Sequence, residues 1–144
     1  MSVLIPTLLS CACSRSPDER RGTSCNVLLV TLDTTRADYL SCYRHTPQTT
    51  PNLDALAQNG VCFDLAISPS AATPPAHASI LTGLNPPRHE VRVIYGQEGY
   101  RLPDFVPTLT TVLKDAGWHT AAFLSSFTVS DFYGFGRGFD TFCT

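Results

Sequence analysis

Thr73 and His77 lie four residues apart in a segment whose residue types could cleave an ester. Residues 76–82, followed by Gly83, are predicted to be helical, and we expect Thr73 at an N-cap because Pro74 after it has the position that Pro favours at a helix start. A hydroxyl there faces free backbone N–H groups and the positive helix end, which favours phosphate or sulfate. The spacing predicts Thr73 as a nucleophile and His77 as a contact to the anion or leaving group. A capping Thr and a surface His are the alternative.

Asp33 ends an apolar run at residues 26–32 that is typical of a strand buried in a parallel sheet. Ligands of open α/β sheets bind outside the carboxyl ends of the strands, so Asp33 is a candidate site residue. A metal held by Asp33 that also touched the Thr73 hydroxyl would lower the pKa of that hydroxyl and activate it. The alternative is that Asp33 starts a turn and caps the next segment through its side chain.

The elements that must position these residues alternate in type along the chain. Patterns of apolar, capping and turn residues predict strands at 26–32, 61–67 and 118–124, and helices at 50–60, 76–82 and 108–116. In the first helix Thr50 is the expected N-cap, and Leu53, Leu56 and Ala57 form the apolar face. This alternation predicts an α/β fold with a mainly parallel sheet flanked by helices.

Composition narrows the class of protein. The chain has 144 residues, 43% apolar and 15% charged, with a formal net charge of −2, as in an ordinary one-domain globular protein. Its basic residues are scattered singly and no apolar run reaches the length of a membrane-spanning helix. These features argue against a nucleic-acid partner and against a multi-pass membrane protein.

The first 24 residues differ in character from the rest. Residues 1–13 predict a signal or lipoprotein-type segment, because a short apolar stretch ends in small residues and Leu8-Leu9-Ser10-Cys11 resembles a lipobox. The protein would then be periplasmic or extracellular, with a lipid anchor to the membrane if Cys11 is acylated. No Lys or Arg precedes the stretch, so an apolar end without function is the alternative. Residues 14–24 are polar and predict a linker, and the folded part begins near Cys25.

Other potentially reactive side chains point less clearly to a site. The six cysteines, at positions 11, 13, 25, 42, 62 and 143, have no regular spacing, which leaves a disulfide framework undecided and argues against a zinc site. Cys25, Cys42 and Cys62 lie in or beside apolar segments and are expected to be buried thiols. His89 is expected to structure a loop, with lining the site as the alternative. His45 and His119 are expected at the surface or in hydrogen bonds.

Three segments, in this order and spacing, resemble the N-terminal part of the sulfatase family, which belongs to the alkaline phosphatase superfamily. They are residues 26–38 (NVLLVTLDTTRAD), 50–57 (TPNLDALA) and 73–83 (TPPAHASILTG). The likeness continues through residues 86–89, 108–122 and 138–140, and so covers residues 25–144. The resemblance implies a truncated α/β domain of alkaline phosphatase type that is the N-terminal part of a catalytic domain.

The resemblance also implies a metal site. In the family an acidic pair at a strand end opens that site; Asp33 matches its first member, and Thr34 stands where the second carboxylate would be. Asp33, Thr34 and Thr73 are therefore the implied metal residues, with one ligand weakened. The implied cofactor is a divalent cation, with Ca²⁺ favoured and Zn²⁺ or Mn²⁺ as alternatives.

The nucleophile motif departs from the family pattern. The family has C-x-P-S-R, in which Cys or Ser is oxidised to formylglycine, whereas Thr73, Pro75, Ala76 and His77 occupy those places here. Oxidation of Thr73 would give a ketone, so the formylglycine route is closed. Superfamily relatives with an unmodified Thr or Ser mostly cleave or transfer phosphate esters, which favours phosphate over sulfate.

Further departures concern contacts to the anion. His77 replaces the motif Arg and exchanges a fixed bidentate cation for a titratable imidazole. Ser125 and Phe127 stand where the family has a Lys and a His that contact sulfate. Two hypotheses follow. The first is the N-terminal part of a metal-dependent hydrolase acting on a small-molecule, glycan or lipid sulfate or phosphate ester, inactive as this fragment alone because other ligands lie further downstream in the family. The second is a non-catalytic, degenerate α/β module.

Overall fold

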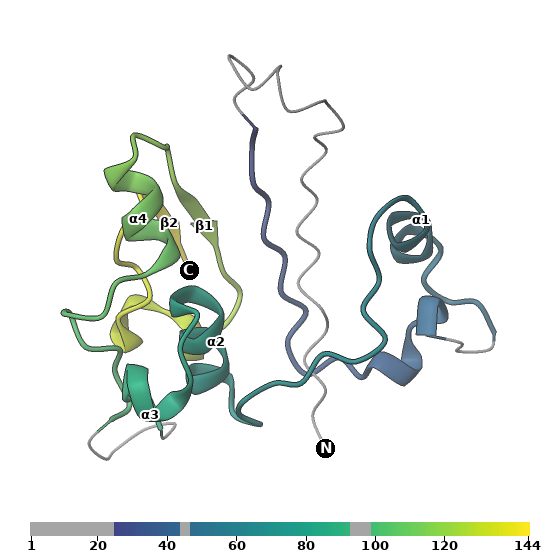
Figure 1. Cartoon of the computed structure of the whole chain (residues 1–144), viewed down its shortest axis with the longest axis horizontal. Coiled ribbons are helices and arrows are strands. Elements are labelled where there is room, and N and C mark those ends of the chain that lie inside the picture. The colour runs from purple at the N-terminus through teal and green to yellow at the C-terminus, as the bar shows by residue number, and fades with distance from the viewer. Residues whose placement is uncertain (1–24, 44–46, 93–98) are drawn as a thin grey trace. The chain divides into compact units, whose positions relative to one another are not determined.

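The structure is a computed structural model that describes residues 25–43, 47–92 and 99–144, drawn in colour in Figure 1. The chain forms two compact units, Met1–Ile67 and Ser68–Thr144. The predicted signal or lipoprotein-type segment, the predicted linker and His45 lie outside the described residues. Within the described ranges, no helix has both the length and the apolar character needed to cross a membrane.

The first unit contains one α-helix and two short 3-10 helices. Helix α1 covers Pro51–Asn59, and the 3-10 helices η1 and η2 cover Ala37–Tyr39 and Ser41–Tyr43. The prediction of the first helix is confirmed, with Thr50 at the N-cap position and Pro51 directly after it.

The predicted apolar face of α1 is only partly correct. Asp54 is the buried residue of this helix, whereas Leu56 is exposed. The Asp54 carboxylate accepts hydrogen bonds from Gln48 Nε2 at 2.7 Å and from Thr50 Oγ1 at 3.3 Å. These bonds offset the cost of removing a carboxylate from water.

Two of the three predicted strands are not formed: in the part of the chain that the structure describes, residues 26–32 and 61–67 belong to no strand. A strand buried in a parallel sheet needs hydrogen-bonded neighbours and covered faces. Both segments instead expose apolar side chains, with Leu28 74% and Leu65 78% exposed. The two predictions are wrong because an apolar run shows only that a segment is suited to burial. Whether the segment forms a strand depends on neighbouring strands and covering elements, which the run itself does not specify.

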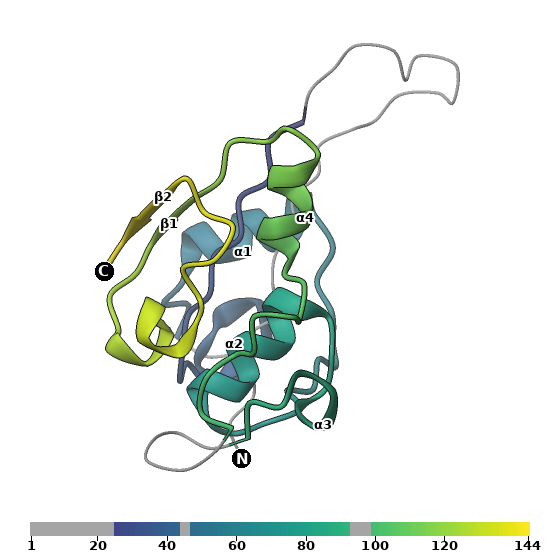
Figure 2. The ribbon, with the colours of Figure 1, turned by 90° about the vertical axis from the view of Figure 1, so that its left-hand side faces the viewer.

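The second unit holds the remaining helices and a small sheet, which Figure 2 shows from the side. Its α-helices are α2 (Thr73–Thr82), α3 (Pro86–His89) and α4 (Leu109–Asp115), and its 3-10 helices are η3 (Phe127–Val129) and η4 (Asp131–Tyr133). The helix predicted at 108–116 is confirmed: Thr108 Oγ1 caps α4 by accepting the Thr111 N–H, and Thr111 Oγ1 accepts the Thr108 N–H.

The described sheet has two parallel strands, β1 (Ala121–Phe123) and β2 (Thr141–Cys143), with Ala121 opposite Thr141. Strand β1 lies inside the strand predicted at 118–124, and its Phe123 side chain is 77% exposed. Strand β2 was not predicted, because three residues are too few to show a period. The α/β class is thus confirmed for the described residues, with a much smaller sheet than predicted.

The core of the second unit lies among its helices. Buried side chains from α2, η3, η4 and the loops between them pack into one cluster: Ala78, Val91, Leu102, Val106, Val129, Tyr133 and Phe135. This cluster holds α2, which carries Thr73 and His77, against the rest of the unit.

Candidate functional site

Thr73 is the first residue of α2, and Ala72 takes the N-cap position. The helix therefore begins three residues before the predicted span of 76–82. The N-cap is Ala72, so the prediction that Thr73 is the N-cap is wrong by one position. A proline is tolerated anywhere in the first helical turn, so Pro74 and Pro75 both fit inside it and neither fixes the first residue. Thr73 is half-buried and remains at the N-terminal end of the helix.

The N-terminal turn of α2 offers fewer hydrogen-bond donors than predicted. Pro74 and Pro75 have no N–H, and the Ala76 N–H donates to the Ala72 carbonyl at 3.1 Å. Of the first four helical residues, only Thr73 therefore has a backbone N–H outside the helical hydrogen bonds. The expectation of several free N–H groups around an anion is therefore wrong for residues 74–76, and the helix dipole and side chains must supply the attraction there.

His77 is hydrogen-bonded to Thr73, which precedes it by one helical turn. Its Nδ1 lies 3.0 Å from the Thr73 carbonyl oxygen. Because a carbonyl oxygen only accepts, Nδ1 carries the proton of this bond, and in the neutral imidazole Nε2 is then the basic nitrogen. The structure thus brings His77 and Thr73 together, and the bond fixes the tautomer of the ring.

Asp33 and Thr34 form a tight turn in the first unit. Asp33 Oδ1 accepts the Thr34 N–H at 2.8 Å, and Thr34 Oγ1 donates to the Asp33 carbonyl at 2.7 Å. Thr34 has a φ of 57°, in the left-handed region that a β-branched residue rarely adopts. Locally, Asp33 has the turn-forming role that was the alternative to metal binding. The strain at Thr34 marks the turn as unusual.

His89 is fully buried and structures the loop after α2, as expected. The Val91 N–H donates to Nδ1 at 3.1 Å, so the proton lies on Nε2, which is 2.9 Å from Ser79 Oγ. Ser79 Oγ in turn donates to the Pro75 carbonyl at 3.0 Å. Burial lowers the pKa of His89. No pattern in the sequence around Ser79 predicts this role, because its hydrogen-bond partner His89 lies in another helix.

Phe127 belongs to an aromatic cluster. Its ring centroid lies 5.3 Å from that of Phe132 and 5.7 Å from that of Tyr133. The preceding Ser126 accepts the Thr128 N–H and caps η3. Phe127, which replaces the His of the family pattern, therefore contributes to packing. His119 is exposed, as expected.

Similarity to known proteins identifies the family. The family model for sulfatases matches residues 25–144, the whole of the chain apart from its first 24 residues. The chain belongs to the sulfatase family. At the level of the family, the activity is the hydrolysis of sulfate esters.

Several individual sulfatases are similar to this chain. An N-acetylgalactosamine-6-O-sulfatase of Bacteroides thetaiotaomicron is 33% identical over 96 residues, which are 66% of this chain and 19% of that protein. The uncharacterized sulfatase YidJ of Escherichia coli is 32% identical over 100 residues, 66% of this chain and 18% of YidJ. Human arylsulfatase A is 40% identical over 63 residues, 44% of this chain and 12% of that enzyme. The chain spans about a fifth of the length of the first two of these relatives. No solved structure matches the chain.

The donor atoms of Asp33 and Thr73 are of the type that a hard cation prefers. Asp33 and Thr73 offer oxygen atoms, which Ca²⁺ and Mn²⁺ prefer, whereas Zn²⁺ in proteins is bound mainly by nitrogen and sulfur. Among the described residues, no three His, Cys, Asp or Glu side chains form a group that could hold a metal ion. The oxygen donors of Asp33, in the first unit, and of Thr73, in the second, are therefore of the type that a hard divalent cation prefers.

Proposed function

We propose that this chain is the N-terminal part of a metal-dependent ester hydrolase of the sulfatase family that uses unmodified Thr73 as its nucleophile. The observation that carries the proposal is the pairing at the start of α2, where His77 Nδ1 lies 3.0 Å from the Thr73 carbonyl oxygen. This bond keeps an imidazole beside the hydroxyl-bearing residue, at the helix end whose dipole attracts anions.

The proposed substrate is a phosphate monoester, on a small molecule, a glycan or a lipid. Thr73 Oγ1 attacks phosphorus while the bond from phosphorus to the leaving oxygen breaks, and that oxygen takes up the proton from the Thr73 hydroxyl to leave as an alcohol. Water then cleaves phosphothreonine to inorganic phosphate and the free hydroxyl. Phosphate is favoured over sulfate because Thr73 cannot form the aldehyde that sulfate expulsion needs in the family.

The proposal assigns Asp33, Thr34 and Thr73 as the residues of this chain that would hold a divalent cation. A bound cation would lower the pKa of the Thr73 hydroxyl and offset the charge of the ester. Oxygen donors favour Ca²⁺, with Mn²⁺ next. We also propose that the 144-residue chain alone is inactive, because Ca²⁺ takes roughly six to eight oxygen ligands and these residues supply fewer.

The second candidate is a non-catalytic module. It is favoured by the prolines that remove N–H donors from the first turn of α2 and by the packing role of Phe127. On this view Thr73 is only a helix-starting residue, and His77 only stabilises the turn.

The product of the complete gene separates the two candidates. We expect it to hydrolyse an aryl phosphate faster than the matching aryl sulfate when Ca²⁺ or Mn²⁺ is added. Thr73→Ala should lower kcat by at least about a thousandfold, while Thr73→Ser keeps the hydroxyl and measurable turnover. Acid quenching should trap phosphothreonine at position 73, detectable by mass spectrometry. Turnover that survives Thr73→Ala would exclude the nucleophile, and faster turnover of the sulfate would exclude the substrate preference.

A further inference from the structure

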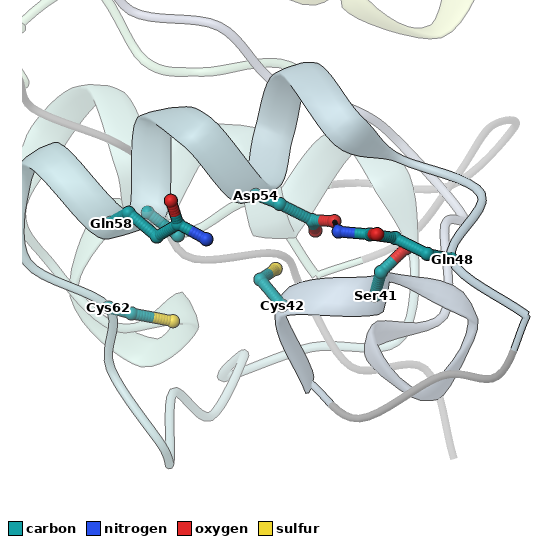
Figure 3. A pocket seen from close by; sticks show the side chains of 7 residues that line it. Ser41, Cys42, Gln48, Asp54, Gln58 and Cys62 are labelled. Atoms are coloured by element: carbon teal, nitrogen blue, oxygen red, sulfur yellow. Dashed lines mark hydrogen bonds between the residues drawn. The ribbon is translucent and has the colours of Figure 1, made fainter.

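Cys42 and Cys62 line the same pocket of the first unit. The pocket has a volume of about 300 Å³ and lies beside α1, with Asp54 and Gln58 on its helical wall (Figure 3). Cys42 enters it from η2, and Cys62 enters from the chain just after α1. Two thiols that are twenty positions apart in sequence thus open into one small space.

The backbone segments on both sides of these thiols are tied together. Tyr43, next to Cys42, donates a hydrogen bond from its hydroxyl to the carbonyl of Phe63, next to Cys62, at 3.0 Å. The Ser41 N–H donates to Thr50 Oγ1 at 2.9 Å, which fixes η2 to the start of α1. The neighbours of the two cysteines are therefore in contact independently of the sulfur atoms.

The two thiols differ in accessibility. Both are free in the structure; Cys62 is exposed and Cys42 is half-buried. Burial first, and the neighbouring Cys62 second, raise the pKa of Cys42. Cys62 is therefore the thiol that a dissolved reagent reaches first, and Cys42 is the thiol placed to react next.

We propose that Cys42 and Cys62 form a reversible disulfide by exchange with a small-molecule disulfide. The Cys62 thiolate attacks one sulfur of that disulfide, forms a mixed disulfide and releases one small thiolate. The Cys42 thiolate then attacks Cys62 Sγ, which forms the bond between residues 42 and 62 and releases the second small thiolate. The two protein thiols are oxidised and the small disulfide is reduced to two thiols, so atoms and electrons balance.

The disulfide would join η2 to the chain after α1 across the loop that contains the whole helix. Such a link restricts the unfolded chain and stabilises the packing that already brings Tyr43 and Phe63 together. Reduction would restore two thiols that line the pocket. The proposal does not depend on the activity of Thr73, so the failure of either proposal leaves the other standing.

The test uses the 144-residue chain equilibrated with mixtures of glutathione and glutathione disulfide, either in its native state or in urea. Four Ser replacements, at Cys11, Cys13, Cys25 and Cys143, leave only the pair of interest. In that background, Cys42→Ser and Cys62→Ser are the matched controls, because each can form a mixed disulfide but no internal one. Far-ultraviolet circular dichroism checks that the variants fold.

Trypsin separates the two cysteines, because it cleaves after Arg36, Arg44 and Arg88. We expect mass spectrometry to find peptides 37–44 and 45–88 joined, with a loss of two hydrogen atoms. The native chain should form this bond at a glutathione ratio at least about tenfold more reducing than the chain in urea requires. Equal tendencies in the two states, or mixed disulfides alone in the native chain, would overturn the proposal. If the four-Ser variant does not fold, the same peptide map of the unaltered chain decides between these outcomes.

Discussion

His89 Nε2 lies 2.9 Å from Ser79 Oγ and donates a hydrogen bond to it, which joins the short helix α3 to the middle of α2. The assignment of the proton follows from the other ring nitrogen, since Nδ1 accepts the Val91 N–H at 3.1 Å. A fully buried imidazole is thereby satisfied at both nitrogens while neutral. This bond fixes the loop that follows the helix carrying Thr73 and His77.

Removal of the Ser79 hydroxyl should destabilise the second unit. Ser79→Ala leaves the buried Nε2–H of His89 without an acceptor, so we expect the free energy of unfolding to fall by about 1–3 kcal/mol. Thr82→Ala is the matched control, because Thr82 Oγ1 lies on the same helix and bonds to backbone groups, donating to the Ala78 carbonyl at 2.6 Å and accepting the Leu84 N–H at 3.2 Å. Urea denaturation measures the free energy of unfolding of both variants. An equal loss of stability in the two would contradict a special role for the bond between Ser79 and His89.

The stability of the chain should decrease below about pH 6.5 because of His89. Burial lowers the pKa of this imidazole from its ordinary value of 6.5 in the folded state. Well above 6.5 the residue is neutral in both states, so its contribution does not vary with pH there. As the pH falls, the unfolded chain gains a proton that the folded chain does not, and stability is lost until the folded pKa is passed. His89→Gln should reduce this slope, which urea denaturation at a series of pH values measures.

Lys114 should control the titration of Asp140. Lys114 Nζ lies 2.8 Å from Asp140 Oδ1, and the Thr120 N–H donates to Oδ2 at 3.0 Å. Together they lower the pKa of Asp140 from 3.8 to about 2, with the bond from Lys114 as the largest cause. The stabilisation is present above pH 3.8 and is lost as the pH falls through about 2.

Lys114→Met should therefore raise the pKa of Asp140 toward 3.8, and Lys114→Arg should keep it low. A carboxyl-carbon NMR titration follows the residue directly. An unchanged pKa in Lys114→Met would show that Thr120 alone holds the carboxylate.

A residue that tolerates the left-handed region should stabilise the turn after Asp33. Thr34 has a φ of 57°, and Asn adopts such angles with less strain than a β-branched side chain. We expect Thr34→Asn to raise the free energy of unfolding by about 1 kcal/mol. Thr34→Val keeps the branch and should give no gain. A loss of stability in Thr34→Asn would show that the bond from Thr34 Oγ1 to the Asp33 carbonyl matters more than the backbone strain.

Local sequence signals placed helices α1 and α4 correctly. Helix α1 begins at Pro51 after Thr50, and α4 begins at Leu109 after a capping Thr108, as the capping residues predict. In α4 the signal works because the Thr108 hydroxyl accepts the Thr111 N–H, whereas Thr50 makes no capping bond and α1 follows the preference of Pro51 for the first helical position. The start of α2 was misplaced by the same logic, since two consecutive prolines allow more than one first residue.

The sequence by itself determined the family, the helix caps and the chemistry of the candidate residues, because these depend on residue types and short spacings. Tertiary structure alone decided that residues 26–32 and 61–67 are not strands, that β1 pairs with β2, and that Asp54 is buried. It also decided that Ser79 meets His89 and that Cys42 and Cys62 share a pocket. Each of these outcomes needs partners from distant positions, and a residue's own type and its near neighbours do not specify which partner the folded chain brings to it.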